Sequence, residues 1–446
     1  MKAIPDPLLS LRDWTLVRRV PGGETTLLAG IDLDILPGRW LAVLGANGSG
    51  KSSLLKYLAS DESPLAETAA IMFQDPDEQI FGASVERELT LGRSGLDAPG
   101  ILGEFDLAGL DQMNPRLLSA GQKQRLVLAV ALAAGPGVLL CDEPTALQDP
   151  VQSGWVLDRL ERWKKETGGA LVTATCDRAE AVRADWLVVL KEGRIVTQGP
   201  TAEMISTPEV ENLLGDGRPV QPIPIHSGNP GADVLLELGG LNCRFTGPGS
   251  GFGNVGLRVG SGERIGITGP NGCGKSTLLA ACAGARRPDS GSVRLDGRLM
   301  YARKSRELDH GTAMIAPQFP EYLFTRSTVA EEIRLDPLLA SREPADFLAE
   351  LGLDPDLAGR NPHDLSSGQR RRLALGMVIL SGRPVLLLDE PTAALDRAGR
   401  TLVLDLLDRS CPGTAMMIAS HDRSFLEAAG CRILNLGPEG LSRSTP

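Results

Sequence analysis

The stretch Gly45-Ala46-Asn47-Gly48-Ser49-Gly50-Lys51-Ser52-Ser53 decides the fold of this chain, and it recurs as Gly269-Pro270-Asn271-Gly272-Cys273-Gly274-Lys275-Ser276-Thr277. Both copies fit the pattern G-x-x-x-x-G-K-[ST], in which glycines let the backbone wrap around a polyphosphate and point its N–H groups inward. The lysine reaches the outer phosphates, and the hydroxyl of Ser52 or Ser276 is placed to ligate Mg²⁺. A chance Gly-rich turn would explain one copy but not two at the same place in a repeated unit. We therefore expect two nucleotide-binding sites.

The chain consists of one unit of sequence repeated twice. The second loop lysine follows the first by 224 residues, and the later motifs recur at intervals of 244 to 247 residues. Intervals of this length indicate duplicated domains. Residues 215–232 read GDGRPVQPIPIHSGNPGA, which is rich in Pro and Gly and predicts a short linker. We expect a first domain over residues 1–214, the linker over 215–232 and a second domain over 233–446.

Composition limits the function classes. Of the 446 residues, 42% are hydrophobic and 23% charged, which is ordinary for a globular protein. The net charge of −10 argues against nucleic acid as the main partner. Seven cysteines without metal-ligand spacing favour a reducing, cytoplasmic setting. The N-terminus has no signal-peptide pattern, and no apolar run approaches the roughly 18 residues of a membrane span. In a membrane process, we expect this chain to act as a peripheral subunit.

Short apolar segments predict the sheet around each loop. Residues 41–44 and 264–267 read as strands that feed the two loops, and helices are expected to begin at Lys51 and Lys275 with their N-termini on the phosphates. Residues 138–141 and 385–388 are unbroken apolar runs, which suit strands covered on both faces. The sequence thus predicts an α/β fold with a mainly parallel sheet.

Each of these later strands ends in Asp-Glu-Pro-Thr. Asp142 and Asp389 are expected to hold Mg²⁺ through its waters, and Glu143 and Glu390 to orient or deprotonate an attacking water. The plainer alternative is a charged strand end at the surface. Two carboxylates after a buried strand, downstream of a phosphate loop, favour the hydrolytic interpretation.

Two further segments, Leu118-Ser119-Ala120-Gly121-Gln122 and Leu365-Ser366-Ser367-Gly368-Gln369, are more specific. With them the chain resembles a tandem ATPase of the ABC (ATP-binding cassette) superfamily over nearly its whole length. The resemblance implies two cassettes, each with a parallel core, an antiparallel β part and a helical subdomain, that pair within one chain and bind ATP with Mg²⁺. It also implies that each signature caps the nucleotide of the opposite cassette. The first loop would pair with Ser366, Gly368 and Gln369, and the second with Ser119, Gly121 and Gln122.

Other positions of the family pattern can be placed in this sequence. Gln74 and Gln318 match the glutamine that contacts Mg²⁺ or water and joins the core to the helical subdomain. Residues 146–149 and 393–396 match a loop that crosses the cassette interface. Phe245 matches the aromatic residue that stacks on adenine, and the first half offers Arg18 there. An ordinary strand-end residue is the alternative at both of these last positions.

One departure from the family pattern separates the halves. Ser420-His421-Asp422 supplies the histidine expected to hydrogen-bond the γ-phosphate, whereas the first half has Thr175-Cys176-Asp177. A thiol is a weak donor and cannot replace an imidazole. We expect impaired hydrolysis at the first loop. A small residue that only packs at a strand end is compatible with the same sequence.

The segments after the two glutamines narrow the class of ABC protein. Residues 74–86 read QDPDEQIFGASVE and residues 318–329 read QFPEYLFTRSTV. These resemble the two ATPases of energy-coupling factor (ECF) importers of vitamins or transition metals. The resemblance implies integral membrane partners, a transmembrane coupling protein and a substrate-binding component, at the inner face of the membrane. The alternatives are a ribosome-associated tandem ATPase, a fused sugar-importer ATPase and a non-hydrolysing nucleotide sensor.

Two expectations concern individual side chains. Carboxylates beside each glutamine are expected to receive an arginine from a helix of the membrane partner, or else to be solvated helix faces. Cys273 lies in the second loop beside Lys275, which predicts a reactive thiolate, with a thiol facing the domain interior as the alternative. The carboxylates are Asp75, Asp77, Glu78, Glu86 and Glu88 in the first half, and Glu321, Glu331 and Glu332 in the second.

Overall fold

The computed structural model describes residues 5–20, 23–146, 148–214, 233–244, 251–301, 311–393 and 395–443. The chain divides into two compact units, Met1–Gly217 and Arg218–Pro446. The linker predicted over 215–232 and the predicted adenine-stacking Phe245 lie outside the described residues. Within the described ranges, none of the helices combines the length and apolar character needed to cross a bilayer.

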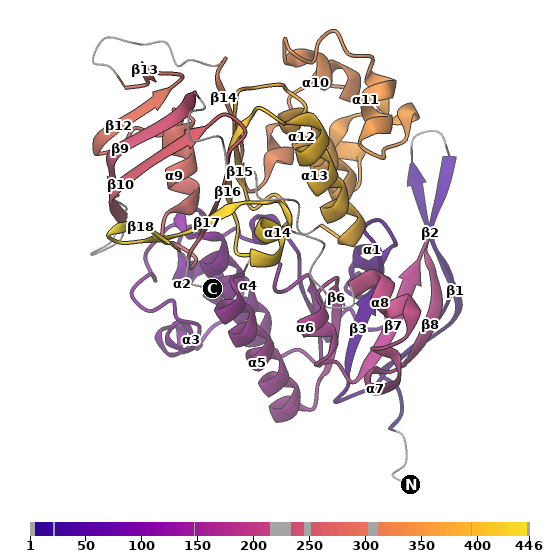
Figure 1. Cartoon of the computed structure of the whole chain (residues 1–446). Coiled ribbons are helices and arrows are strands. Elements are labelled where there is room, and N and C mark those ends of the chain that lie inside the picture. The colour runs from indigo at the N-terminus through magenta and orange to yellow at the C-terminus, as the bar shows by residue number, and fades with distance from the viewer. Residues whose placement is uncertain are drawn as a thin grey trace. The chain divides into compact units, whose positions relative to one another are not determined.

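The first unit starts with a long antiparallel hairpin and continues with alternating strands and helices (Figure 1). Its elements are β1 (Leu9–Val20), β2 (Gly23–Ile35), β3 (Trp40–Leu44), α1 (Lys51–Leu58), β4 (Ala69–Met72), η1 (Pro76–Glu78), α2 (Val85–Thr90), α3 (Ala98–Glu104), η2 (Pro115–Leu117), α4 (Ala120–Ala133), β5 (Val138–Asp142), α5 (Pro150–Thr167), β6 (Ala170–Thr175), α6 (Arg178–Ala181), β7 (Trp186–Lys191), β8 (Arg194–Pro200), α7 (Thr201–Met204) and α8 (Pro208–Leu214).

The second unit repeats this order with a larger antiparallel part. Its elements are β9 (Val234–Arg244), β10 (Gly251–Gly260), β11 (Arg264–Thr268), α9 (Lys275–Cys282), β12 (Ser290–Leu295), β13 (Arg298–Leu299), β14 (Ala313–Ala316), η3 (Pro320–Leu323), α10 (Val329–Leu335), α11 (Pro344–Glu350), η4 (Pro355–Gly359), η5 (Pro362–Asp364), α12 (Ser367–Ile379), β15 (Val385–Asp389), α13 (Arg397–Ser410), β16 (Ala415–Ala419), α14 (Arg423–Ala428), β17 (Arg432–Gly437) and β18 (Gly440–Arg443).

The main sheets of the two units have the same topology. Among the described residues, the strand order is β4-β5-β6-β3-β7-β8 in the first unit and β14-β15-β16-β11-β17-β18 in the second. Neighbouring strands are parallel except in the pairs β7/β8 and β17/β18, which are antiparallel. Separate antiparallel sheets contain β1 and β2, and β9, β10, β12 and β13. The predicted α/β fold with a mainly parallel sheet and an antiparallel part is confirmed.

The central strands deliver the phosphate loops to one edge of each sheet. β3 is buried at all five positions, and α1 begins at Lys51 after the loop. β11 and α9 repeat this arrangement, with α9 beginning at Lys275. Because β3, β5 and β6 are parallel neighbours, their carboxyl ends meet at the same edge. The segments that follow these three strands carry the phosphate loop, Glu143 and Cys176.

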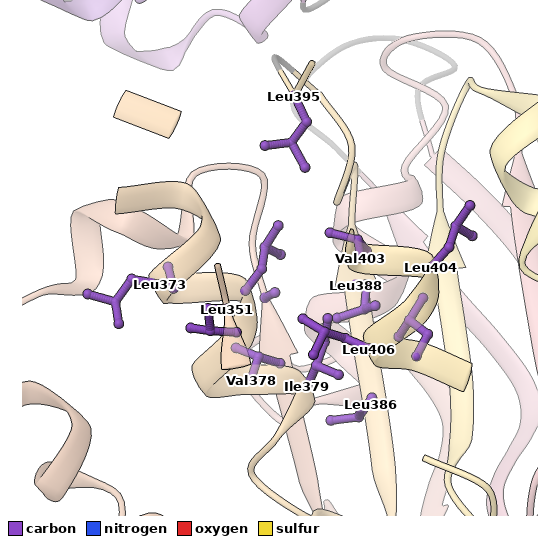
Figure 2. Close-up of a cluster of buried hydrophobic side chains, with 14 of the residues drawn as sticks. Leu351, Leu373, Val378, Ile379, Leu386, Leu388, Leu395, Val403, Leu404 and Leu406 are labelled. Carbon is purple, nitrogen blue, oxygen red and sulfur yellow. The ribbon is translucent and has the colours of Figure 1, made fainter. Parts of the chain in front are cut away.

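A buried cluster joins the helical part of the second unit to its sheet (Figure 2). Leu351 and Val378 pack from the helical part, and Leu388 from β15 and Leu406 from α13 complete the contact. Gly376 makes close packing possible, since a Cβ there would come within 3.0 Å of the Leu351 Cγ and nearer still to its methyl groups. The helix that follows the second signature is thereby fixed to the strand that ends in Asp389.

Candidate functional site

Each phosphate loop is closed by its own lysine. Lys51 Nζ donates to the carbonyl oxygens of Gly45 at 2.7 Å and Ala46 at 3.3 Å. Lys275 Nζ makes the matching bonds to the first two residues of the second loop, also at 2.7 and 3.3 Å. The loops also need their glycines, because Gly50 has φ 106° and a Cβ there would lie 2.7 Å from Leu28 Cδ2. The same cradle therefore exists in both units.

Two of the three residues predicted to hold Mg²⁺, the serine and the aspartate, lie together in each unit. The Ser52 hydroxyl hydrogen-bonds Asp142, and the Ser276 hydroxyl hydrogen-bonds Asp389. Burial raises the pKa of both aspartates, that of Asp389 to about 6, although the serine bonds oppose this. Buried oxygen donors whose charge is poorly solvated suit a hard divalent cation. The donor set therefore fits Mg²⁺ in each unit.

Glu390 is held at several points in the second unit. Its carboxylate accepts hydrogen bonds from Ser420 Oγ at 3.0 Å and from the His421 backbone N at 3.2 Å, and it lies 3.0 Å from His421 Nδ1. Burial lowers the pKa of His421, but the bond and charge of Glu390 outweigh that effect and the net shift is upward. Carboxylate and imidazole thus form a fixed pair.

The matching pair in the first unit is weaker. The Cys176 backbone N donates to Glu143 at 3.4 Å, and the Cys176 Sγ lies 3.5 Å from the Gly45 carbonyl oxygen and 3.6 Å from Lys51 Nζ. Burial raises the pKa of Glu143 to about 6 against the opposing charge of Lys51. Burial also lowers the pKa of Lys51, but Cys176, Glu143 and Asp142 outweigh it and the net shift is upward. The sulfur therefore lies between the phosphate loop and the carboxylate, where the second unit has an imidazole.

The two signatures begin helices with the same capping arrangement. Ser119 Oγ accepts from the Gln122 backbone N at 3.3 Å, and the Gln122 side chain accepts from the Ser119 N at 2.9 Å. Ser366 and Gln369 do the same at 3.3 and 3.0 Å. These are capping boxes, which explains why the glutamine stands three residues after the serine. The serines are exposed at helix N-termini, and the predicted contact of each signature with the opposite nucleotide stays a prediction.

The remaining predicted positions are also placed. Gln74 and Gln318 follow β4 and β14 and are half-buried, and the Gln318 carbonyl accepts a bond from Arg371. Asp149 caps α5 by accepting from two backbone N–H groups, and Arg18 is exposed on β1. The loops that contain Asp149 and its counterpart include residues 147 and 394, which lie outside the described residues.

A family model decides the identity of the chain. The model of the ABC transporter family matches residues 28–95, 97–146 and 252–393, which is more than half of the 446 residues. The chain belongs to the ABC transporter family. Its two units are two cassettes in tandem, called here the first and second cassettes, and the protein binds ATP and is an ATPase.

Related proteins carry similar descriptions. A putative ABC transporter ATP-binding protein of Bifidobacterium longum is 27% identical over 93% of this chain and 63% of its own length. A putative HMP/thiamine import ATP-binding protein of Bacillus subtilis is 26% identical over 94% of this chain and 88% of its own length. An uncharacterized ABC transporter ATP-binding protein of Mycobacterium tuberculosis is 30% identical over 94% of this chain. The chain spans less than two thirds of the first and third of these relatives, 63% and 60% of their lengths.

Solved structures share the fold. A model of ribosome-bound archaeal Pelota and ABCE1 has a TM-score of 0.70 and 22% identity, and the match covers 92% of this chain and 74% of that chain. A structure described as RNase-L Inhibitor has a TM-score of 0.62 and 21% identity, over 93% of this chain and 88% of that chain. Sequence identity this low shows that the fold is shared, but it gives no information about the binding partner.

Several acidic residues predicted to face a partner serve the fold instead. Glu88 is buried and accepts from the backbone N atoms of Phe81 and Gly82. Glu332, which follows it by 244 residues, is also buried and accepts from two backbone N–H groups at 2.7 and 2.8 Å. The docking prediction is wrong for these two residues, because their carboxylates already accept hydrogen bonds from backbone N–H groups of their own loops. The sequence offered one signal of this structural role, because the two glutamates occupy the same position in the two repeats.

Other carboxylates of that set are paired within their own cassette. Asp77 lies 2.7 Å from Lys123 Nζ, and Glu321 lies 3.6 Å from Arg371 Nη1.

Gln79, the second glutamine of the first-half motif, was not singled out from the sequence. Its side-chain oxygen accepts from Phe73 N at 2.6 Å and its amide nitrogen donates to the Ile71 carbonyl at 2.8 Å, so it fixes the chain just before Gln74.

Cys273 does not have the environment of a thiolate. Burial raises the pKa of its thiol, and the nearby Lys275 only opposes this shift. The side chain packs against the buried cluster under the antiparallel sheet, and a Cβ at Gly269 would lie 2.8 Å from its Sγ. The thiolate prediction is wrong and the alternative, a thiol facing the interior, holds.

Glu180 is a buried carboxyl group that the sequence analysis overlooked. It is fully buried, Thr145 Oγ1 lies 3.3 Å from its Oε2, and Thr175 also hydrogen-bonds it. Within the described part of the chain, its Oε1 has no hydrogen-bond partner. Burial, reinforced by the charge of Glu143, raises the pKa of Glu180 well above 4.5. The second cassette has Phe425 at this place.

We expect Glu180→Gln to stabilise the protein at neutral and higher pH. Because the folded-state pKa of Glu180 is raised, its contribution to the free energy of unfolding is complete below about pH 4.5 and is lost as the pH rises from that value through the folded-state pKa. Glutamine does not titrate, so the variant does not lose this stability as the pH rises. Thermal unfolding at pH 5 and pH 8 should therefore show a gain over the unmodified chain that is larger at pH 8. The exposed Glu166→Gln is the control, and an equal loss of Tm at both pH values for Glu180→Gln would contradict a raised pKa of Glu180.

Proposed function

We propose that this chain is the ATP-hydrolysing subunit of an importer of the ECF type, for a vitamin or a transition metal. It would work at the inner face of the membrane with two integral partners, a transmembrane coupling protein and a substrate-binding component. The observation that carries the proposal is the segment after Gln74, whose Q-D-P-D-E-Q sequence resembles those importers and whose second glutamine fixes the strand end at Phe73. The Bacillus subtilis relative described as a putative HMP/thiamine importer ATPase supports it.

The second candidate function is a tandem ATPase that acts on the ribosome. It is favoured by the ribosome-bound structure with a TM-score of 0.70, but 22% identity supports the shared fold alone. The net charge of −10 disfavours a large RNA-binding surface. We therefore rank the importer first.

The surface proposed to meet the membrane partner carries exposed apolar side chains in both cassettes. Phe81, in the segment after Gln74, is 77% exposed. In the matching segment of the second cassette, Tyr322 is 52% and Leu323 60% exposed. Exposed aromatic and aliphatic side chains beside a folded loop are typical anchors for a partner helix. We therefore propose these apolar side chains as the docking residues, in place of the carboxylates that bond loop backbone or pair within their own cassette.

We propose that the second cassette performs most of the hydrolysis. Lys275 would bind the outer phosphates, and Glu390, fixed by Ser420 and His421, would take the proton of the attacking water. Because Nδ1 of His421 is engaged with Glu390, Nε2 is the nitrogen proposed to donate to the γ-phosphate. Mg²⁺ would neutralise charge on the phosphates.

The residues proposed to hold Mg²⁺ are the buried Ser–Asp pairs and the two half-buried glutamines. They are Ser276, Asp389 and Gln318 in the second cassette, and Ser52, Asp142 and Gln74 in the first.

Affinity purification of the full chain from detergent-solubilised cells tests the importer proposal. We expect polytopic membrane proteins to copurify, and Phe81→Asp to reduce their recovery because a buried unpaired charge replaces an apolar anchor. The control is Val196→Asp, since Val196 is also exposed but lies on β8. Copurification of ribosomal subunits in place of membrane proteins would overturn the proposal in favour of the second candidate.

A further inference from the structure

A buried arginine in the second cassette connects two parts of the proposed catalytic region. Arg371 lies in the first half of α12 and is 3% exposed. Its Nη1 donates to the Gln318 carbonyl oxygen at 2.8 Å, and its Nη2 donates to the Glu390 carbonyl oxygen at 2.8 Å. One rigid guanidinium thus holds the backbone of both the glutamine segment and the carboxylate turn.

The carboxylate turn has a backbone that needs such support. Glu390 has φ 47°, in the left-handed region that non-glycine residues rarely adopt. Conformations of this kind persist when surrounding contacts fix them. The Glu390 carbonyl accepts two donors, the Ala393 backbone N at 3.1 Å and the Arg371 guanidinium. Arg371 is therefore part of what orients the carboxylate that points to Ser420 and His421.

The arginine is balanced by one carboxylate in the segment after Gln318. Glu321 Oε1 lies 3.6 Å from Arg371 Nη1, and the Glu321 side chain is only 11% exposed. Burial lowers the pKa of Arg371, and the charges of Glu321, Glu390 and Asp389 oppose that effect. Removal of the guanidinium alone would leave the Glu321 charge buried without its partner.

The first cassette lacks this connection. Gln124 stands at the position that corresponds to Arg371, 247 residues earlier. Its side-chain amide donates to the Pro144 carbonyl and accepts from Gln148 Nε2 at 2.7 Å. These bonds tie the signature helix to the segment after Glu143, and no bond from Gln124 to the Gln74 backbone is present among the described contacts. The two cassettes therefore differ in the support of the turn as well as in Cys176 and His421.

We propose that Arg371 is a positioning residue for ATP hydrolysis in the second cassette, where it fixes the backbone of Glu390 relative to that of Gln318. The inference rests on the proposed hydrolytic role of the second cassette. It predicts that loss of the two-carbonyl contact slows turnover while ATP binding is retained, because the phosphate loop is not touched. The first cassette, with Gln124, does not depend on such a contact.

The variant Arg371→Gln in the full chain tests the proposal. We expect kcat to fall by about tenfold or more, since small misplacements of a catalytic group cost up to about 10²-fold. The KM for ATP and the number of bound nucleotides should stay unchanged. Arg372→Gln is the matched control, because Arg372 is the next residue of the helix and, among the described residues, donates to the Gly352 carbonyl alone, at 3.2 Å. An unchanged kcat in a folded Arg371→Gln protein would overturn the proposal.

Two further variants distinguish the proposed positioning role of Arg371 from an effect of its charge and from an effect on protein stability. Arg371→Gln combined with Glu321→Gln removes the stranded carboxylate, so we expect recovered thermal stability with kcat still low. Arg371→Lys keeps the charge for Glu321, but one ammonium cannot reproduce the planar fork, so kcat should again be low in a folded protein. Full kcat in either variant would overturn the proposal. If Glu390→Gln itself left turnover intact, the proposed hydrolytic role of the second cassette would fail instead.

Discussion

Glu390→Gln is expected to remove most of the ATPase activity of the chain, whereas Glu143→Gln is expected to leave most of it in place. A general base contributes about 10²–10⁴-fold to a rate, so its loss from the active cassette is a large effect. Glu390, the proposed base, is the better positioned of the two carboxylates because Ser420, the His421 backbone and the His421 ring all hold it. A bound carboxylate needs little reorganisation when the proton moves.

Glu143 has a different environment. Its carboxylate accepts a long bond of 3.4 Å from the Cys176 backbone N and a further bond from the Cys176 thiol, and burial raises its pKa to about 6. Thr175, the counterpart of Ser420, hydrogen-bonds the buried Glu180. The first-cassette carboxylate is half-buried and has weaker support, so its contribution to steady-state turnover should be small.

Steady-state hydrolysis of ATP by the purified chain, with thermal unfolding and nucleotide stoichiometry as controls, checks this pair of variants. Both should bind two nucleotides, because neither substitution touches the lysines of the phosphate loops. An equal loss of turnover from Glu143→Gln and Glu390→Gln would contradict unequal cassettes. A larger loss from Glu143→Gln would reverse the assignment.

The parts of the fold that were predictable are those that local steric rules determine. The glycines around Lys51 and Lys275 permit only a tight loop, and an apolar run before them must be a strand covered on both faces. The strands and helix starts were accordingly placed within one or two residues of their observed bounds. The repetition of the whole pattern supplied the two-unit organisation without any knowledge of contacts.

Individual side chains were harder to predict because their partners depend on distant packing. Glu88 and Glu332 looked like surface charges, yet each folds back onto the backbone N–H groups that precede its helix. Cys273 stands beside Lys275 in sequence, but the turn of the loop directs it to the apolar cluster. The connection made by Arg371 joins residues that lie 53 and 19 positions away, so no local pattern reveals it.

Cys176→His is expected to raise turnover in the first cassette, and the clearest background for the test is Glu390→Gln, where the second cassette is silenced. Loss of one well-placed donor costs about 10²–10³-fold, and an imidazole would restore such a donor in whole or in part. The backbone supports the exchange. Cys176 N lies 3.4 Å from Glu143, close to the 3.2 Å between His421 N and Glu390, so the new ring would start from a similar position.

The interpretation of increased turnover in Cys176→His depends on the contacts that the Cys176 thiol makes in the unmodified chain. Its sulfur lies 3.6 Å from Lys51 Nζ and 3.5 Å from the Gly45 carbonyl, so its removal alone changes the surroundings of the loop lysine. Cys176→Ala is therefore the matched control. If alanine raises turnover as much as histidine, relief of the sulfur contact is the cause and the imidazole has no donor role. If histidine alone raises turnover, and the gain vanishes when Glu143→Gln is added, the histidine must act together with the carboxylate, as His421 is proposed to act with Glu390. No gain from histidine in a folded protein would leave Cys176 as a packing residue.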